Sequence, residues 1–379
     1  MSAIRFDRNE LAGSFGDVGT DLPLIFGMIL AARLDAASVL IVFGFCQVLT
    51  GVVYRLPMPM QPLKAMAVLV IAGGVSSGEL FGGGLAIGLV MLALSLTGGL
   101  EWLAARIPLA VVRGIQLGLG LSLARLALER YVPSQGAAGW ALAGAGFAVL
   151  LVLWGNRRVP GGLVVIGLGL VYALVFRADL GALAEGAGLA LPELRRPTAA
   201  EIWTGFLVLA LPQLPLSLSN SVIATAQTVR DLFPGRRVGV RRIGFTYSAV
   251  NLAAPFLGGI PVCHGSGGLA GHYALGARTG GSVILYGSML AAFGLFLSGS
   301  VTQIVEIFPL PILGVVLLVE SLTLMRLVGD VAGDRRGLAI ALLVAVVALT
   351  LPQGYLIGLA LGVALHYLPV RYGREAVSE

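Results

Sequence analysis

The chain has 379 residues, of which 57% are hydrophobic and 12% are charged, and its formal net charge is +6. So few charged residues exclude an ordinary soluble domain, and apolar runs of roughly 18 to 25 residues indicate a helical membrane protein. The excess of positive charge comes from arginines in short loops between apolar runs. Such arginines are typical of cytoplasmic loops, and they require no nucleic-acid partner. With only Cys46 and Cys263 as cysteines, no disulfide framework, metal site or cofactor is expected.

Apolar runs separated by short polar connections predict an all-α polytopic membrane protein with fourteen transmembrane segments. In the fifth segment, Gly114 and Gly118 lie four residues apart, a spacing that lets a neighbouring helix approach closely. The segments are expected at residues 11–32, 36–56, 60–75, 80–104, 107–128, 137–155, 160–177, 201–226, 243–258, 262–276, 280–302, 304–325, 336–351 and 353–370.

The chain divides into two halves of seven segments each. Its longest polar connection runs from Arg177 to Glu201, so the first half covers residues 1–177 and the second covers residues 201–379. Because seven is an odd number, the two halves would cross the membrane in opposite directions. This arrangement is an inverted repeat, in which segment 3 corresponds to segment 10.

Short sequences repeat at corresponding places in the two halves. Asp-Leu-Pro-Leu at 21–24 resembles Gln-Leu-Pro-Leu at 213–216, and the stretch led by Pro59 resembles the one at 259–265. Proline and glycine at these points predict that segments 3 and 10 are half-helices preceded by extended backbone. Matching interruptions of this kind point to the binding site of a transporter.

The distribution of arginine predicts that both termini are cytoplasmic. With the N-terminus inside, five arginines fall on outside connections (Arg33, Arg130, Arg177, Arg195 and Arg196), and Arg113 and Arg125 fall within a segment. The other seventeen of the twenty-four fall on inside connections or the termini. This asymmetry follows the positive-inside rule. We therefore expect a multi-pass protein of an inner or plasma membrane.

Lys64 is the one lysine of the chain, and it ends the sequence Pro-Met-Pro-Met-Gln-Pro-Leu-Lys in an apolar region. A charge at membrane depth costs at least about 2.5–3.5 kcal/mol, so such a residue is by default a functional candidate. Where extended backbone gives way to a half-helix, the first amides lack partners and the helix dipole favours an anion. Two facing half-helices would therefore hold a tetrahedral oxyanion between Gln61 and Lys64 and the glycine-rich stretch at 265–268.

Several motifs resemble the molybdate transporter family, which is related to the sulfate permeases. They are Phe-Gly-Asp-Val-Gly-Thr-Asp-Leu-Pro (15–23), Pro-Met-Pro-Met-Gln-Pro-Leu-Lys (57–64), Leu-Pro-Leu-Ser-Leu-Ser-Asn-Ser-Val-Ile-Ala-Thr (214–225), Cys-His-Gly-Ser-Gly-Gly-Leu-Ala-Gly-His-Tyr (263–273) and Gly-Ala-Arg-Thr-Gly-Gly (276–281). The resemblance spans nearly the whole chain. It implies the seven-plus-seven inverted-repeat fold of uracil permease.

The resemblance also implies two domains and a place for the substrate. Segments 1–4 and 8–11 (about 10–104 and 201–302) would form a core domain, and segments 5–7 and 12–14 (about 107–177 and 304–370) a gate domain. Substrate would lie between segments 1, 3, 8 and 10, and no C-terminal cytoplasmic regulatory domain is expected. The candidate substrate-binding residues are Asp17, Thr20, Gln61, Lys64, Ser219, Asn220, Ser221, Gly265, Ser266 and Gly267.

Each candidate also has a purely structural alternative. Lys64 could be the ion-pair partner of Asp17 or Asp21, and those two carboxylates could instead be helix caps. The amide and hydroxyl side chains could simply join helices by hydrogen bonds. His264 could relay protons or make one structural hydrogen bond. Asp17, Asp21 and His264 are the candidates for proton coupling.

These features predict a secondary active transporter, not an enzyme, for a tetrahedral oxyanion: molybdate first, with tungstate competing, and sulfate or another anion as an alternative. A nucleobase permease of the same fold is the nearest rival, and its site resembles one with carboxylates on segments 8 and 10. This chain has no Asp or Glu between Glu201 and Asp231, or between Asp231 and Glu306. A hydrolase using Ser266 and His264 and a channel-like anion conductor are further alternatives. The expected partners are the oxyanion substrate and membrane lipid, and a homodimer is possible from the sequence.

Overall fold

The structure, a computed structural model, describes residues 3–104, 106–153, 161–177, 188–352 and 354–368. The first half contains α1 (Arg8–Gly13), α2 (Val18–Ala32), α3 (Ala36–Tyr54), β1 (Met60–Pro62), α4 (Lys64–Ala72), α5 (Ser77–Thr97), α6 (Gly99–Ala104), α7 (Leu109–Leu126), the π-helical η1 (Ala127–Tyr131), the 3₁₀ turn η2 (Val132–Gln135), α8 (Gly136–Val152) and α9 (Gly161–Phe176). The second half contains α11 (Ala199–Gly205), η3 (Phe206–Ala210), α12 (Leu211–Leu216), η4 (Ser217–Ala224), α13 (Thr225–Leu232), α14 (Val240–Ala253), η5 (Ala254–Leu257), β2 (Val262–His264), α15 (Ser266–Ala274), α16 (Gly281–Phe296), α17 (Ser298–Ile307), α18 (Leu310–Arg326), η6 (Leu327–Val331), α19 (Arg335–Thr350) and α20 (Gly354–Tyr367).

Five helical stretches of the described chain are long and apolar enough to cross a membrane. They are Ala36–Tyr54, Ser77–Thr97, Leu109–Val152, Ala199–Leu232 and Leu310–Val331. Shorter apolar helices accompany them, among them Val18–Ala32 and Gly281–Phe296. The chain is therefore a multi-pass helical membrane protein, and the count of fourteen segments stays a prediction.

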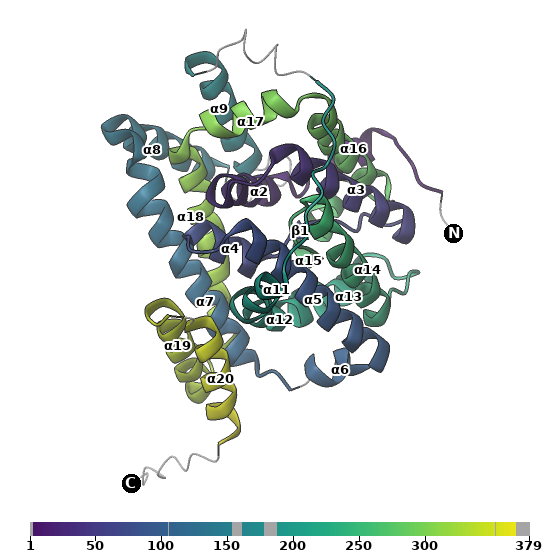
Figure 1. Cartoon of the computed structure of the whole chain (residues 1–379), viewed down its shortest axis with the longest axis vertical. Coiled ribbons are helices and arrows are strands. Elements are labelled where there is room, and N and C mark those ends of the chain that lie inside the picture. The colour runs from purple at the N-terminus through teal and green to yellow at the C-terminus, as the bar shows by residue number, and fades with distance from the viewer. Residues whose placement is uncertain (1–2, 105, 154–160, 178–187, 353, 369–379) are drawn as a thin grey trace.

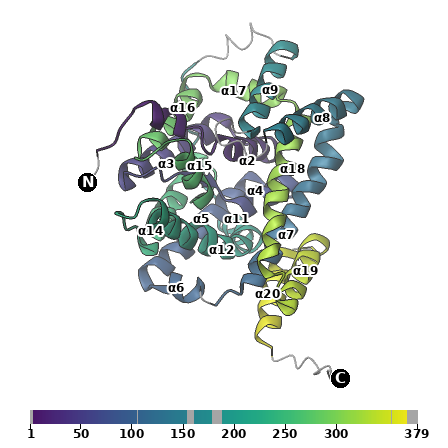
Figure 2. The ribbon, with the colours of Figure 1, turned by 180° about the vertical axis from the view of Figure 1, so that it is seen from behind.

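The helices pack in two groups. In one group α3 lies along α16, and α5 packs against α11 and α14. In the other, α7 packs against α18 and α19, and α19 packs against α20. Figure 1 shows α7, α18, α19 and α20 along one side of the molecule and α3, α14, α15 and α16 along the other, and Figure 2 shows the same division from behind.

Glycines set the closest helix contacts in both groups. A Cβ at Gly44 on α3 would overlap the carbonyl oxygen of Gly287 on α16, and the reverse is also true. The predicted packing role of Gly114 and Gly118 is confirmed, since both face α19. A Cβ at Gly114 would lie 2.6 Å from the Ala341 carbonyl oxygen. Small residues thus let these helix backbones touch.

The predicted segment boundaries are wrong in three places. Segment 1 is broken before α2, because residues 14–17 form a turn. Segment 8, expected at 201–226, is longer: helix runs from Ala199 to Leu232, with the widened turns η3 and η4 on either side of α12. The break expected at 303 lies instead at Leu297 and before Leu310, where prolines begin α18, a position that proline favours.

Two short strands cross near the middle of the first group of helices. β1 and β2 pair antiparallel, with Gln61 opposite Cys263 and Met60 opposite His264. Each strand leads directly into a nine-residue helix, α4 after β1 and α15 after β2. In Figure 1, β1 lies between α4 and α15.

Both outer edges of this small sheet are closed by amide side chains. Gln47 on α3 donates from Nε2 to the Met60 carbonyl (2.7 Å), and its Oε1 accepts from the Met60 amide (2.9 Å). Asn251 on α14 makes the same pair of contacts with Val262, at 2.7 and 2.9 Å. All buried backbone polar groups need partners, and here equivalent side chains supply them to each strand. We refer to these as the two strand clamps.

Candidate functional site

A cavity of about 230 Å³ lies where the two strands give way to α4 and α15. None of the described residues that line it is Asp or Glu, while one is a lysine. The wall is therefore built of donors and apolar groups, which suits an anion better than a cation. The lining residues are Gln61, Lys64, Gln213, Leu216, Asn220, Ser221, Cys263, His264, Gly265, Ser266, Gly267, Leu324 and Leu327.

The N-terminus of α15 is open towards the cavity. Gly265 precedes the helix in an extended conformation, and no side chain caps the first turn. Gly265, Ser266 and Gly267 all line the cavity. Backbone amides at such a position, together with the helix dipole, attract negative charge. Backbone alone can therefore provide part of an anion site here.

Two glycines at this end of α15 leave room for polar side chains from the first half. A Cβ at Gly265 would overlap Oε1 of Gln61, and a Cβ at Gly268 would overlap Oδ2 of Asp17. A larger residue at either position would have to displace those groups. The glycine-rich sequence thus has a packing cause in addition to its exposure of amides.

Asp17 lies behind Gln61 and is held by it. Gln61 Nε2 donates to both carboxylate oxygens of Asp17, at 2.8 and 2.6 Å, and both residues are buried. Asp17 occupies the N-cap position of α2, but its side chain makes no capping hydrogen bond. The capping alternative is therefore wrong for its carboxylate, which faces α15 and Gln61 instead.

Asp21 is fully buried, one turn further along α2. The Tyr286 hydroxyl, from α16, donates to its Oδ2 at 3.4 Å. Asp21 is not among the described residues that line the cavity. It therefore lies within the first group of helices and does not cap α2.

The N-terminus of α4 differs from that of α15 because a side chain occupies it. Gln213 on α12 accepts through Oε1 from the amides of Ala65 (2.9 Å) and Met66 (3.4 Å). Its Nε2 donates to Ser217 Oγ at 3.1 Å, and that oxygen also contacts the Tyr247 hydroxyl at 2.8 Å. Lys64, the first residue of α4, lines the cavity beside this cap.

His264 lines the cavity but directs a ring nitrogen elsewhere. Its Nε2 is 2.7 Å from Thr246 Oγ1 on α14, and its ring stacks edge-on against Tyr54. Nε2 is thus engaged with Thr246, so it is not available as the base that a hydrolytic nucleophile needs.

The structure brings most of the predicted substrate ligands to one cavity. Asp17 lies just behind the wall, Thr20 is half-buried on α2 and not among the described lining residues, and the Ser219 side chain lies outside the described part of the structure. The predicted residues on the wall are Gln61, Lys64, Asn220, Ser221, Gly265, Ser266 and Gly267.

Sequence reasoning missed five residues of this wall. Gln213 carries a signal, because it is an amide between two prolines in an apolar run. Leu216, Cys263, Leu324 and Leu327 are apolar or weakly polar and carry no signal that separates them from ordinary core residues. Leu324 and Leu327 belong to α18 and η6, in the second group of helices.

The fold is similar to that of solved membrane transporters. It is similar to the transmembrane domain of a cyanobacterial bicarbonate transporter, BicA (TM-score 0.69, 16% identity, covering 94% of this chain and 98% of that one). It is also similar to murine Slc26a9, described as an anion transporter in the inward-facing state (TM-score 0.69, 13% identity, covering 97% of this chain and 68% of that one). At these identities the likeness concerns the fold alone.

The family follows from closer relatives. Residues 9–123 and 205–324 match a family model described as a molybdate transporter of the MFS superfamily. Molybdate transporter 1 and Molybdate transporter 2 of Arabidopsis thaliana are each 32% identical, covering 85% and 95% of this chain and 80% and 87% of their own lengths. Molybdate transporter 1 of Chlamydomonas reinhardtii is 29% identical over 94% of this chain and 91% of its own. The chain belongs to the molybdate transporter family.

Proposed function

We propose that this chain is a secondary active transporter that carries molybdate, or a closely related tetrahedral oxyanion, by alternating access. The observation that supports it best is the cavity wall, which combines Lys64 and the open N-terminus of α15 and contains no carboxylate among its described residues. A doubly negative substrate gains from one full positive charge and from a helix dipole in a poorly hydrated site.

In this proposal the first half contributes Gln61 and Lys64, and the second half contributes the α15 amides. Asn220 and Ser221, on η4, would donate from a third side. Charge-assisted hydrogen bonds to oxyanion oxygens are shorter and stronger than neutral ones. Molybdate and tungstate, which are alike in size and charge, should compete closely, while sulfate is smaller.

Alternating access would come from movement of a core domain against a gate domain. The first group of helices corresponds to the proposed core, which carries the anion, and the second to the proposed gate. Leu324 and Leu327 would then be the gate-domain side of the cavity. The proposal also includes fourteen transmembrane segments in an inverted repeat. Both termini would lie in the cytoplasm, and the membrane would be the inner or plasma membrane of the cell.

Asp17 is the strongest candidate for coupling to protons. Its carboxylate lies against Gly268, in the first turn of α15, where a substrate anion would also lie. The carboxylate and a bound anion would both be negative and would repel each other at this short separation. Anion binding would therefore favour protonation of Asp17. Asp21 and His264 are the other candidates. If a pH gradient imposed across a liposome leaves molybdate uptake unchanged, coupling is excluded.

The rival functions make different demands on the same cavity. A nucleobase permease would need an acceptor carboxylate at the wall, and the described wall has none. A sulfate transporter would need the same groups as a molybdate transporter. Only a measurement of binding or transport distinguishes these two functions. A channel-like conductor would give uptake that does not saturate.

The decisive experiment is equilibrium binding of molybdate, tungstate, sulfate and uracil to the purified protein. We expect molybdate and tungstate to bind and to displace each other, with sulfate weaker and uracil absent. Uracil binding without oxyanion binding would contradict the proposal. Saturable molybdate uptake into liposomes would then separate a transporter from a channel.

A further inference from the structure

A second cavity, of about 240 Å³, lies at the other end of α4. Lys64, the first residue of α4, lines the first cavity, and Ala72, the last, lines this one. Nine helical residues span roughly 12 Å. The second cavity is otherwise formed by α7, η1 and α19, through Ser122, Arg125, Leu126, Glu129, Arg130 and Leu349.

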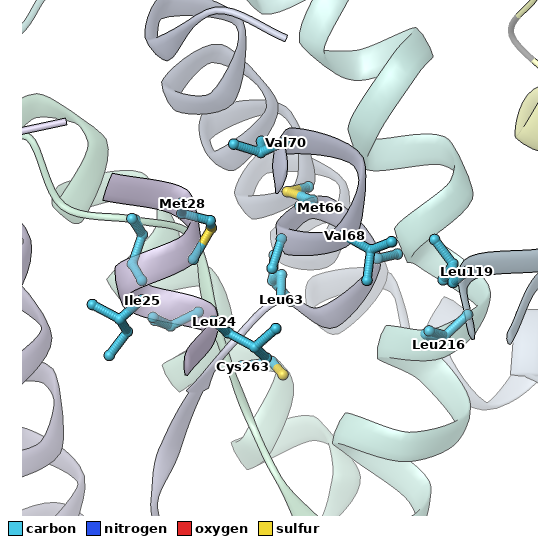
Figure 3. Close-up of a cluster of buried hydrophobic side chains, with 14 of the residues drawn as sticks. Leu24, Ile25, Met28, Leu63, Met66, Val68, Val70, Leu119, Leu216 and Cys263 are labelled. Carbon is cyan, nitrogen blue, oxygen red and sulfur yellow. The ribbon is translucent and has the colours of Figure 1, made fainter. Parts of the chain in front are cut away.

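Buried apolar side chains separate the two cavities. Val68 on α4, Leu119 on α7 and Leu216 on α12 point towards one another (Figure 3) and are all buried. Leu216 also lines the first cavity. These three side chains offer an anion no polar group between the two ends of α4, and we call them the Val68–Leu119–Leu216 barrier.

The second cavity holds two arginines because the helix widens there. Arg125 and Arg130 are five residues apart and would point about 140° apart on a regular α-helix. Between them begins η1, a π-helical turn, in which each residue turns through a smaller angle. Both side chains consequently line one cavity. Guanidinium groups never lose their charge and match oxyanion geometry well.

A neighbouring acid holds one of these arginines. Arg125 Nε donates to Glu129 Oε2 at 3.0 Å, whereas among the described residues Arg130 forms no ion pair. Ser122, whose Oγ lies 2.9 Å from the Tyr355 hydroxyl, adds a hydroxyl. The cavity thus offers the Arg130 guanidinium, the Arg125 guanidinium that Glu129 already pairs with, and the Ser122 hydroxyl.

We propose that this cavity is a reception site for the transported oxyanion, on the opposite side of the Val68–Leu119–Leu216 barrier from the Lys64 cavity. The proposal rests on the proposed transport function. Arg130 captures the anion, and Arg125 joins it once the anion displaces Glu129. Local positive charge raises the concentration of anions at the mouth of a path and speeds their association.

The test is the initial rate of molybdate uptake into liposomes against external concentration, at low and high ionic strength. Arg130→Gln should raise KM roughly three- to tenfold at low salt, with the maximum rate unchanged and the difference shrinking at high salt. Glu129→Gln should lower KM, because Arg125 is released. Arg196→Gln, which removes a charge from an exposed loop on the same predicted side, is the matched control.

The outcomes separate this site from the function itself. If the wild-type protein neither binds nor transports molybdate, the proposed function fails. If it transports and neither Arg130→Gln nor Glu129→Gln moves KM, the reception site alone is overturned. It is also overturned if anionic lipid raises the wild-type KM and Arg130→Gln abolishes that effect, since the occupant would then be a lipid phosphate.

Discussion

The two short helices at the Lys64 cavity are alike in setting but differ at their N-termini. α4 and α15 each have nine residues and each follow a three-residue strand. The first amides of α4 are occupied by Gln213, and a lysine begins the helix. The first turn of α15 has no side-chain cap and begins with Ser266 and two glycines.

This difference indicates a division of roles between the two halves. In the proposed site α4 would offer the anion the charge of Lys64, since Gln213 already accepts from its first amides. α15 would offer backbone amides and a dipole, because no side chain caps its first turn. Two short helices with the same strand-to-helix setting can thus present different groups to one cavity.

The largest effect is expected from Gly268→Ala. The added methyl group would overlap the Asp17 carboxylate, so Asp17 and the α15 terminus must move apart. Overpacking of this kind costs up to about 3 kcal/mol, and molybdate affinity should fall roughly 100-fold. The control is Gly144→Ala on α8, where a Cβ would meet nothing within 4 Å. Equal losses from both changes would show that α15 has no special role.

Lys64→Gln should have the next largest effect, since it removes the one formal charge that α4 offers. Losing a charge partner in a buried site costs about 2 kcal/mol, so affinity should fall roughly 30-fold. Equilibrium binding measures this, with Arg237→Gln in the exposed basic loop as the control. If Asp17→Asn restores binding to Lys64→Gln, then Lys64 acts by holding Asp17 and not through the substrate.

Gln213 allows the capping of α4 to be separated from charge. Gln213→Glu keeps an acceptor for the α4 amides but adds negative charge at the wall, so affinity should fall roughly tenfold with little change in thermal stability. Gln213→Leu leaves two buried amides unpaired, which costs about 1–3 kcal/mol of folding free energy. A rise in affinity for Gln213→Leu would show that α4 amides can bind the anion, which would end the contrast with α15.

Much of this site was predictable because a polar residue in an apolar run is conspicuous. Lys64, Gln61 and the stretch from Gly265 to Gly267 stand out for that reason. Pro62 and Pro261 lie beside the breaks before α4 and α15, whereas Pro23 and Pro215 lie inside helices. The short strands that pair across the halves, by contrast, depend on which surfaces meet. So does the cap that Gln213 provides, and no local pattern encodes it.

The arginine-rich loop illustrates the same limit. The sequence indicates a cytoplasmic topology signal at Arg236, Arg237, Arg241 and Arg242. In the structure Arg241 also donates to the Ser95 and Leu96 carbonyls at the end of α5, at 2.8 and 3.0 Å. Cations near helix C-termini are stabilising. Composition predicts the charge of this loop, whereas its partners depend on the fold.

The smallest effect on binding is expected from the strand clamps, which support the two helices without reaching the cavity. Gln47→Leu and Asn251→Leu each leave one buried amide and one carbonyl of a strand unpaired. Each should cost about 1–3 kcal/mol of folding free energy, seen as a lower thermal midpoint.

Their effects on affinity should nevertheless differ, because the clamps lead to unlike helices. Asn251 fixes the strand before α15, whose amides must stay aimed at the anion, so Asn251→Leu should weaken molybdate binding roughly two- to fivefold. Gln47→Leu should change it less, since Gln213 still holds the start of α4 and Lys64 has a flexible stem. If both variants weaken molybdate binding equally, the backbone position of α4 matters for binding as much as that of α15. The N-termini of the two helices would then bind the anion in the same way.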